Sequence, residues 1–252
     1  MISSKINNFL NGNPKIPGDK SISHRSIIIP SISNGVCEIK NYLKSDDVLN
    51  TLDAFKSMGV KVVETENKLI INGNGLNSLK RPNKEIYLGN SGTSARLLAG
   101  LLSSQNFQSI LTGDDSLSSR PMKRIVDPLI KMNAEIISNN DKMPLIIKGR
   151  ELSNRDIDIK IPSAQIKSGV ILAALNTKGI TKIVEHNVTR DHTEIMLDAF
   201  EADIKITNQN SLKMIEINGK KELNSKNIEV PSDLSSSAFF IVATLINNKS
   251  KI

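Results

Sequence analysis

The sequence predicts an α/β (α+β) fold built from repeated units, and three observations carry this prediction. Helix-like segments begin with small polar residues at intervals of 70, 72 and 69 residues. A strand, an amphipathic helix and a strand pair follow each of the first three starts, and a glycine ends each of these units. Such regular self-similarity indicates stacked supersecondary units. The helix starts lie near Ser21, Ser91, Ser163 and Ser232, and the terminal glycines are Gly73, Gly149 and Gly219.

The elements after each helix start follow in one order through three units. The first strands cover residues 37–40, 109–112 and 181–184, and the second helices cover residues 46–58, 121–132 and 192–201. The closing strand pairs cover residues 61–63 and 69–71, 135–137 and 145–147, and 204–206 and 214–217. Each unit is therefore βαβαββ or αβαββ, depending on whether a strand precedes its first helix.

Two features depart from regular repetition. Pro30 lies within the first helix pattern, and because proline inside a helix costs about 3 kcal/mol, we expect this helix to kink or end there. The fourth unit contains only its first helix, and Ile252 falls where its next strand is expected. Because such a unit cannot bury its apolar face alone, we expect further chain to complete it.

Composition indicates a globular protein with anionic partners. The 252 residues carry a formal net charge of +7, which favours nucleic acid or small phosphorylated molecules as partners. Aromatic residues make up 3% and tryptophan is absent, which argues against stacking on single-stranded nucleic acid. A solvated lysine-rich surface is the alternative explanation of the charge. The single Cys37, the short apolar runs and the lack of a signal-like start predict a cytoplasmic protein without a membrane span.

The first helix start, in residues 17–25, resembles a phosphate-binding loop only superficially. A Walker A motif requires glycine where Pro14 and Asp19 stand, so that interpretation fails. What remains is a helix N-terminus with free N–H groups, Lys20 and Arg25, which together attract anions. The alternative is an ordinary serine N-cap beside two exposed cations.

The second helix start, in residues 88–96, contains Gly92, which lets a ligand approach the backbone closely. A glycine-rich turn into a helix explains it equally well. In the loop of residues 112–121, Pro121 is suited to the first position of a helix. We therefore expect Arg120 to be held at that helix start, where its charge opposes the helix dipole. Because this placement is costly unless an anion joins it, it favours a functional role.

The third helix start, in residues 162–168, repeats the pattern and adds Gln165, which both donates and accepts hydrogen bonds. Three such starts from three repeats can converge on one set of anionic ligands, which favours small polyanionic substrates over a long nucleic-acid track. Asp46 and Asp47 are predicted to cap the second helix of the first unit. No metal site is expected, because the remaining candidates lack zinc-ligand spacing; these are His24, His186, His192 and Cys37.

Seven motifs together resemble the EPSP synthase (3-phosphoshikimate 1-carboxyvinyltransferase) family, in family order across nearly the whole chain. They are PGDKSISHRS at residues 17–26, SDDV at 45–48, LGNSGTSARLL at 88–98, SSRPMKRIVDPL at 118–129, PSAQIKSG at 162–169, TRDHTEIML at 189–197 and VPSDLSSSAFF at 230–240. The resemblance implies an inside-out α/β barrel of βαβαββ repeats in two domains. Residues 14–226 would form the substrate-binding domain of three repeats. Residues 1–13 and 227–252 would belong to the second domain, most of which lies outside this chain.

The resemblance also implies ligand roles. Lys20 would contact both substrates, Ser21 and Arg25 would hold shikimate 3-phosphate, and Gly92 and Arg120 would hold phosphoenolpyruvate. Ser163 and Ala164 would bind the shikimate phosphate, and Gln165 would touch both substrates. Thr189 stands where many members carry serine, and Arg190 would be a further phosphate ligand.

The implied reaction transfers the carboxyvinyl group of phosphoenolpyruvate to shikimate 3-phosphate, in the pathway to chorismate and the aromatic amino acids. It needs no cofactor or metal, and the implied protein is a monomer when full length, without nucleic-acid or membrane partners. The family's acid–base residues would lie in the second domain, so no residue of this chain is assigned as catalytic and the chain alone is expected to be inactive. The alternatives are the sister transferase acting on UDP-N-acetylglucosamine, a nucleic-acid-binding protein, and a catalytically incomplete substrate-binding domain.

Overall fold

The computed structural model describes residues 9–66, 68–209, 212–247 and 249–252. The first unit contains α1 (Lys20–Ser31), β1 (Asn34–Lys40), α2 (Asp46–Ser57), β2 (Lys61–Glu64) and β3 (Lys68–Asn74). The second contains β4 (Ile86–Tyr87), α3 (Gly92–Ser103), β5 (Gln108–Thr112), α4 (Asp115–Ser119), α5 (Lys123–Lys131), β6 (Glu135–Asn139) and β7 (Lys142–Lys148). The third contains β8 (Asp156–Ile159), α6 (Ala164–Leu175), β9 (Ile180–Glu185), α7 (His192–Ala199), β10 (Ile204–Gln209) and β11 (Leu212–Asn218). The elements β12 (Ile228–Glu229) and α8 (Leu234–Ile246) follow.

Each unit builds one four-stranded sheet, and all three sheets have the same plan. Their strand orders are β12-β1-β3-β2, β4-β5-β7-β6 and β8-β9-β11-β10, with the first pair parallel and the others antiparallel. The first unit takes its leading strand from β12, where Ile228 lies opposite Ile39. The predicted α/β repeat fold is confirmed, and the described strands form three separate sheets rather than one closed barrel.

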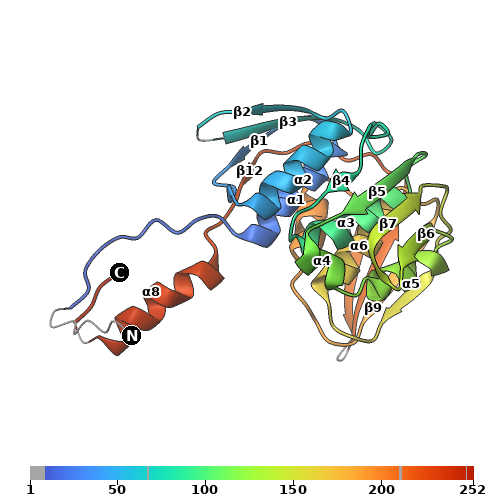
Figure 1. Ribbon diagram of the computed structural model, residues 1–252. Coiled ribbons are helices and arrows are strands. Elements are labelled where there is room, and N and C mark those ends of the chain that lie inside the picture. The colour runs from blue at the N-terminus through green and yellow to red at the C-terminus, as the bar shows by residue number, and fades with distance from the viewer. Residues whose placement is uncertain (1–8, 67, 210–211, 248) are drawn as a thin grey trace.

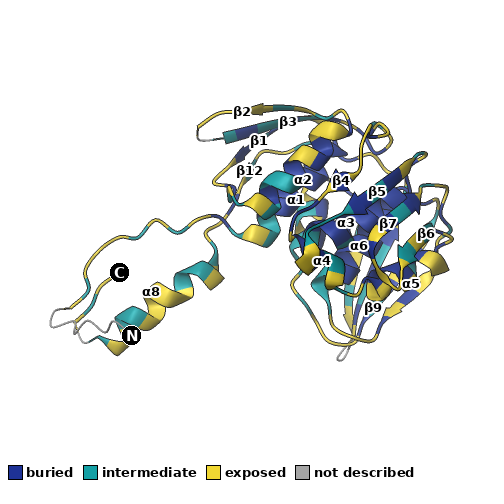
Figure 2. Ribbon diagram, in the orientation of Figure 1, coloured by how far each residue is buried: buried dark blue, intermediate teal, exposed yellow. Residues whose placement is uncertain are grey.

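The first helix of each unit lies in the interior, and the sheets lie outside (Figures 1 and 2). Every residue of α6 from Ile166 to Leu175 is buried, which explains why its apolar residues are distributed around the whole helix. The helices α3 and α6 touch through glycines: a Cβ atom built on Gly100 would lie 1.8 Å from the carbonyl oxygen of Gly169. Only glycine permits such an approach of two backbones.

The glycine that ends each unit has the same packing role. A Cβ on Gly73 would lie 2.1 Å from the carbonyl oxygen of Pro30, near the end of α1. The corresponding distances are 2.3 Å from Gly149 to the oxygen of Gln105, after α3, and 1.9 Å from Gly219 to the oxygen of Thr177, after α6. The repeated glycine is thus explained by close contact between the last strand and the C-terminal end of the unit's own central helix.

Two local predictions have different outcomes. The expected break at Pro30 is confirmed, because α1 ends one residue later at Ser31. The expected helix over residues 121–132 is shorter, since α5 begins at Lys123 and the additional short helix α4 precedes it.

The helix α8 and the segment before α1 stand apart from the three units (Figure 1). None of the residues of α8 is buried, and the side chains of Leu234 and Phe239 are 75% and 80% exposed. Backbone hydrogen bonds join Lys251 to Leu10 and Gly12, so the segment before α1 and the segment after α8 lie side by side. Within the described residues, no helix has the length and apolar character needed to cross a membrane.

Candidate anion-binding site

The starts of α1, α3 and α6 are joined by side-chain hydrogen bonds. Gln165, in the first turn of α6, donates to Thr93 in the first turn of α3 over 3.0 Å. It also accepts a hydrogen bond from Arg96 of α3 over 3.2 Å. From α1, the guanidinium of Arg25 donates to Ser168 of α6 over 2.7 Å. The free N–H groups of three helix starts therefore lie in one region, as the repeat spacing suggests.

The start of α1 carries Lys20 and Ser21 in its first turn. The N-cap is Asp19, whose carboxylate accepts a hydrogen bond from the N–H of Ile22 over 2.8 Å. The side chain of Lys20 is half exposed, and its Nζ lies 2.8 Å from Asp47 Oδ2. The ammonium group is thus fixed by one carboxylate and remains accessible to a ligand.

The expectation that Asp46 and Asp47 cap α2 is wrong in its detail. The N-cap is Ser45, and the two aspartates occupy the first helical turn. From this position both carboxylates still interact favourably with the helix dipole. Asp47 additionally orients Lys20, a tertiary contact that the sequence pattern does not reveal.

Arg25 is a buried cation, with 4% of its surface exposed. Its guanidinium donates to Thr193 Oγ1 over 2.6 Å, to Ser168 Oγ over 2.7 Å and to the carbonyl oxygen of Ser21 over 2.8 Å. Burial lowers the pKa of Arg25 to about 10, so it stays charged at neutral pH. All three hydrogen-bond partners are neutral oxygens, so no carboxylate bonds directly to the guanidinium, although the charges of Glu194 and Asp19 act on it through space.

Further arginines gather at the start of α3. A Cβ atom on Gly92 would lie 2.7 Å from Arg96 Nη1 and 3.1 Å from Arg120 Nη1. Burial, then the charges of Arg120 and Arg124, lower the pKa of Arg96. Among the described residues the only arginine in an ion pair is Arg150, with Glu135. Three arginines, Arg96, Arg120 and Arg124, therefore repel one another, and none of them has a carboxylate partner among the described residues. Binding of an anion would relieve this repulsion.

The reason expected for the placement of Arg120 is wrong. Pro121 does not begin a helix, because α5 starts at Lys123 with Met122 as its N-cap. Arg120 is instead the C-cap of α4, where its charge agrees with the helix dipole. Its guanidinium donates to Asn90 Oδ1 and to Ser116 Oγ, which brings it to Gly92 from a neighbouring loop.

The start of α6 contributes three of the predicted residues. Ser163 is the N-cap, and its hydroxyl accepts from the N–H of Ile166 over 3.4 Å. Ala164 and Gln165 form the first turn. Arg124 donates to the carbonyl oxygens of Ile161 and Pro162, at 3.2 and 3.4 Å, and so connects the arginine cluster to this start.

Thr189 and Arg190 lie in the loop between β9 and α7. The hydroxyl of Thr189 donates to Glu185 Oε1, and Arg190 is exposed. The charge of Arg190 contributes, after burial, to lowering the pKa of both Arg25 and His192. Arg190 therefore lies close enough to Arg25 for their charges to interact.

A second buried polar network lies between α1, α2 and α3. His24 Nδ1 lies 2.8 Å from Thr51 Oγ1 and 3.3 Å from Ser94 Oγ. Ser94 Oγ lies 2.7 Å from the hydroxyl of Ser91, the N-cap of α3. Burial lowers the pKa of His24 from 6.5 to about 3, against the opposing effect of Asp47. The imidazole is therefore neutral at physiological pH.

The buried state of His24 predicts a loss of stability in acid. As the pH falls below 6.5, the unfolded chain binds a proton at His24 that the folded chain accepts only near pH 3. Unfolding is then favoured, by about 2 kcal/mol at pH 5 relative to pH 7. Urea unfolding at both pH values is expected to show a smaller loss for His24→Asn. The control His186→Asn removes an exposed imidazole and should retain the full loss; equal losses for all three proteins would contradict the assignment.

Sequence reasoning missed Arg96 and Arg124. Both lie inside the motif stretches of residues 88–98 and 118–129. Arg96 lies one turn into α3, and Arg124 is the second residue of α5. Arg96 donates to the carbonyl oxygen of Gly92 within α3, whereas the contact of Arg124 with residues 161–162 depends on packing between the second and third units. A helix periodicity argument places Arg96 four residues after Gly92, one turn along α3, and this is the one signal that points to it.

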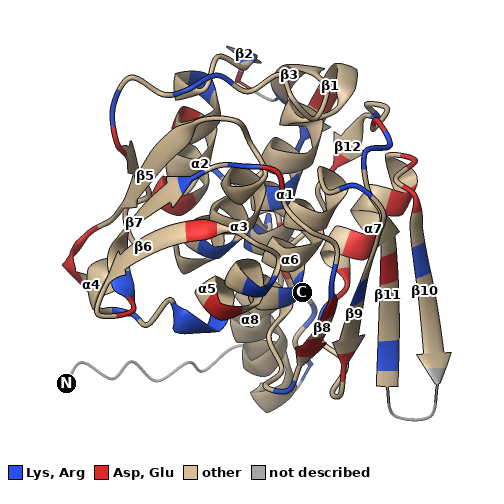
Figure 3. Ribbon diagram, turned by 90° about the vertical axis from the view of Figure 1, so that its right-hand side faces the viewer, with Lys and Arg blue, Asp and Glu red and all other residues tan. Residues whose placement is uncertain are grey.

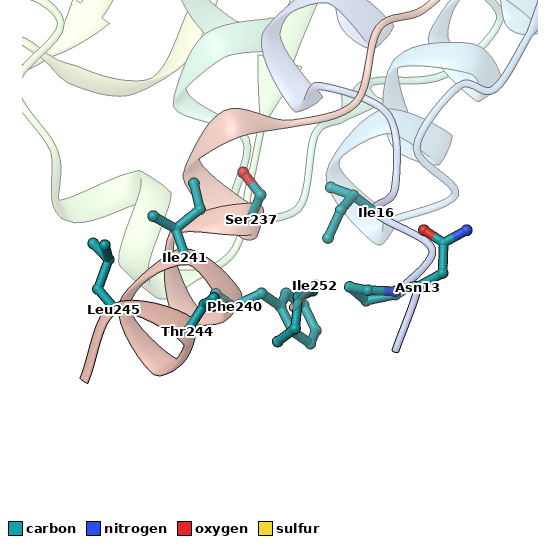
Figure 4. Close-up of a pocket in the computed structure, with 9 residues that line it drawn as sticks. Asn13, Ile16, Ser237, Phe240, Ile241, Thr244, Leu245 and Ile252 are labelled. Carbon is teal, nitrogen blue, oxygen red and sulfur yellow. The ribbon is translucent and has the colours of Figure 1, made fainter. Parts of the chain in front are cut away.

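Neither a metal site nor the pocket beside α8 offers an alternative centre in the described residues. They contain no group of three or more His, Cys, Asp or Glu residues placed to hold a metal ion. A pocket between α8 and the N-terminal segment is lined chiefly by apolar side chains, including Ile16, Phe240, Ile241 and Leu245 (Figure 4). Its described lining has no charged residue, so it does not suit an anion.

Comparisons with known proteins agree with these observations. The family model described as EPSP synthase (3-phosphoshikimate 1-carboxyvinyltransferase) matches residues 5–252. Proteins named 3-phosphoshikimate 1-carboxyvinyltransferase are similar: that of Ruthia magnifica subsp. Calyptogena magnifica is 51% identical over 98% of this chain and 56% of its own length. That of Lactococcus lactis subsp. cremoris (strain SK11) is 45% identical over 96% of this chain and 56% of its own. A solved EPSP synthase from Acinetobacter baumannii superposes with a TM-score of 0.88 at 44% identity, over 96% of this chain and 55% of that one. The chain thus spans about half the length of the relatives it matches.

Proposed function

Since the chain belongs to the EPSP synthase family, we propose that it serves the transfer of the carboxyvinyl group of phosphoenolpyruvate to the 5-hydroxyl of shikimate 3-phosphate. The products are 5-enolpyruvylshikimate 3-phosphate and phosphate. One observation carries this proposal: the starts of α1, α3 and α6 converge with four arginines that form no ion pair with a carboxylate among the described residues. These are Arg25, Arg96, Arg120 and Arg124. The two substrates together bring two phosphates and two carboxylates, which such a surface neutralises.

The proposed ligand roles divide the site between the substrates. Gly92 and Arg120 hold phosphoenolpyruvate, because the backbone at Gly92 is open to the guanidiniums of Arg96 and Arg120. Lys20 and Gln165 lie where both substrates are within reach. The remaining predicted residues, Ser21, Arg25, Ser163, Ala164, Thr189 and Arg190, hold shikimate 3-phosphate.

The reaction is an addition followed by an elimination. The 5-hydroxyl of shikimate 3-phosphate adds to C2 of phosphoenolpyruvate while C3 gains a proton, and the tetrahedral adduct then loses phosphate and a proton from C3. Negative charge on both substrates opposes their approach, and fixed cations and helix N-termini remove this barrier without rearranging. We assign binding and orientation to the residues of this chain, and assign none of them as the general base.

We also propose that the three units form the substrate-binding domain and that the flanking segments belong to a second domain. The exposed helix α8 and its pairing with residues 10–12 support this division. Because β12 pairs with β1 and Val230 is buried, we place the second boundary near Pro231, rather than at residue 226. On the N-terminal side the boundary at residue 14 is retained; of the segment before it, residues 1–8 lie outside the described residues.

Calorimetric titration of the 252-residue chain tests the binding half of the proposal. Shikimate 3-phosphate is expected to bind weakly, and shikimate without its phosphate to bind at least tenfold more weakly. For turnover, the chain is completed with the C-terminal half of the 51% identical relative, and phosphate release is measured. Release that requires both substrates is expected from the completed protein and not from the 252-residue chain. A completed protein that uses UDP-N-acetylglucosamine instead would establish the sister reaction.

Gly92→Ala is expected to weaken glyphosate more than phosphoenolpyruvate, because glyphosate is the longer occupant of the same subsite. The added methyl would lie 2.7 Å from Arg96 Nη1 and 3.1 Å from Arg120 Nη1. The Arg96 guanidinium must then shift and that of Arg120 must give way slightly, and we expect the rearranged subsite to crowd the longer ligand first. Inhibition constants for glyphosate and KM for phosphoenolpyruvate, both in the completed protein, measure the effect. Equal changes for the two ligands would contradict the placement of Gly92.

We further propose that the protein acts in the cytoplasm as a monomer, without nucleic-acid or membrane partners. Lys and Arg are interspersed with Asp and Glu over the face shown in Figure 3, rather than gathered along one track. Salt-dependent RNA binding of micromolar affinity would contradict this, because phosphate-backbone contacts weaken steeply with salt.

A further inference from the structure

Four charged side chains are buried together between α6, α7, β9 and β11. Lys167 Nζ lies 2.9 Å from Glu185 Oε2 and 2.8 Å from Glu194 Oε1. Lys213 Nζ lies 3.2 Å from the same oxygen of Glu194. The side chains of Lys167 and both glutamates have no exposed surface, and that of Lys213 is 5% exposed. We call these four residues the buried quartet.

Stability alone gives a weak account of the buried quartet. Burying ions costs hydration, and replacing a buried ion pair by apolar residues of similar volume is often neutral or stabilising. Glu194 Oε2 also has no hydrogen-bond partner among the described residues, and an unsatisfied buried carboxylate oxygen is a further cost. An arrangement this costly suggests a role in fixing geometry.

The buried quartet is interlaced with the side chains that hold Arg25. On α6, Lys167 belongs to the quartet, and the next residue, Ser168, accepts a hydrogen bond from Arg25. On α7, Glu194 belongs to the quartet, and the preceding residue, Thr193, accepts from Arg25. Lys167 bonds directly to Glu194 over 2.8 Å, beside the 2.6 Å contact between the hydroxyls of Ser168 and Thr193. The ion pair thus joins the same two helices that carry the acceptors of Arg25.

A second connection runs from the buried quartet to the loop after β9. Glu185 uses Oε2 for Lys167 and Oε1 to accept the hydroxyl of Thr189. The loop that carries Thr189 and Arg190 is thereby attached to a buried group through one carboxylate. The bond to Glu185 is the only side-chain hydrogen bond of Thr189 among the described residues.

We propose that the buried quartet is a positioning device for shikimate 3-phosphate: it holds Arg25 through α6 and α7, and Thr189 through Glu185. The proposal rests on the function proposed above. Lys167 and Glu185 act through other residues and do not touch the ligand. Removing their charges while keeping their volume should therefore leave the fold intact and misplace the groups that bind.

Two double variants of the 252-residue chain test the proposal. Lys167→Met/Glu185→Leu removes the ion pair and the acceptor of Thr189, and is expected to raise the dissociation constant for shikimate 3-phosphate at least tenfold. Lys167→Met/Glu185→Gln has the same net charge and restores an oxygen to Thr189, so it should recover part of that loss. Both should keep Tm within a few degrees of the unmodified chain. The matched control Lys148→Met/Glu135→Leu removes an exposed pair at 2.6 Å and should bind as the unmodified chain does.

The outcomes separate this proposal from the proposed function. Unchanged affinity in the folded Leu variant, or no recovery in the Gln variant, overturns the positioning role. If the Leu variant does not fold, the Gln variant decides, and affinity equal to that of the unmodified chain overturns the role. If the unmodified chain does not bind shikimate 3-phosphate, the proposed function fails instead. Hydrogen exchange at residues 186–190 then decides on positioning: faster exchange in the Leu variant supports it and unchanged exchange overturns it.

Discussion

Gly100→Ala is expected to cause a large loss of stability, because the added methyl meets the backbone of a second buried helix. The new Cβ would lie 1.8 Å from the carbonyl oxygen and 2.5 Å from the carbonyl carbon of Gly169. Both atoms belong to backbone inside α6, so α3 and α6 must move apart and the buried contacts along both helices are lost. We expect a loss of about 3 kcal/mol or more. For a chain of this size, that lowers Tm by about 6–12 °C.

Gly12→Ala is the control for this substitution, because nothing lies within 4 Å of a Cβ at Gly12. It should change Tm by no more than about 2 °C, which corresponds to about 0.5 kcal/mol. Thermal unfolding followed by circular dichroism measures both variants. A Gly100→Ala protein with the Tm of the unmodified chain would show that α3 and α6 do not cross at these glycines.

Lys20→Ala is expected to abolish turnover in the protein completed with the C-terminal half of its relative, while leaving the fold intact. The side chain of Lys20 is 51% exposed and its described contact is one ion pair with Asp47 at 2.8 Å. Pairs this exposed contribute only about 0–1 kcal/mol to stability. In the proposed site the same ammonium is shared by two anionic substrates, so its loss is expected to reduce kcat/KM at least a hundredfold, or about 2.7 kcal/mol.

Steady-state kinetics with both substrates, together with Tm, measure the effect of Lys20→Ala. Lys56→Ala is the matched control. Lys56 lies at the far end of α2, is similarly exposed and forms an ion pair with Glu64 of β2. It should retain full activity. A Lys20→Ala protein with more than about a tenth of the original kcat/KM, a loss below about 1.4 kcal/mol, would remove Lys20 from the central role.

Local physical chemistry explains why much of the fold is predictable from the sequence. Apolar periodicity marks α2, α7 and the strand pairs, because one face of each packs inward. Ser91 and Ser163 mark the starts of α3 and α6, since each hydroxyl satisfies a backbone N–H of its own helix. The short helix α4 escapes notice because one turn has no measurable period. The start of α5 is misplaced because Pro121 is an equally good loop residue.

In the candidate site, the sequence predicts the residues at the helix starts. The structure adds charged residues further along the helices, which contact those starts or the residues that position them. Lys20, Gly92 and Gln165 are predictable because N-terminal turns bind anions wherever they occur. Arg96 and Lys167 lie further along their helices, and there a charged residue is more often solvated. Only packing between elements distant in sequence brings Arg96 to Gln165 and Lys167 to Glu194.

By itself, the sequence determined the repeat, its α/β character, the family and the helix starts that gather charge, because these depend on residues close together in the chain. The tertiary structure alone decided that β12 completes the first sheet beside β1, that Gly100 meets Gly169, and that Lys167 is buried between two glutamates. Each of these contacts joins segments distant in sequence. Their partners are selected by the space and charge left when the three units pack together, and no local pattern encodes that selection.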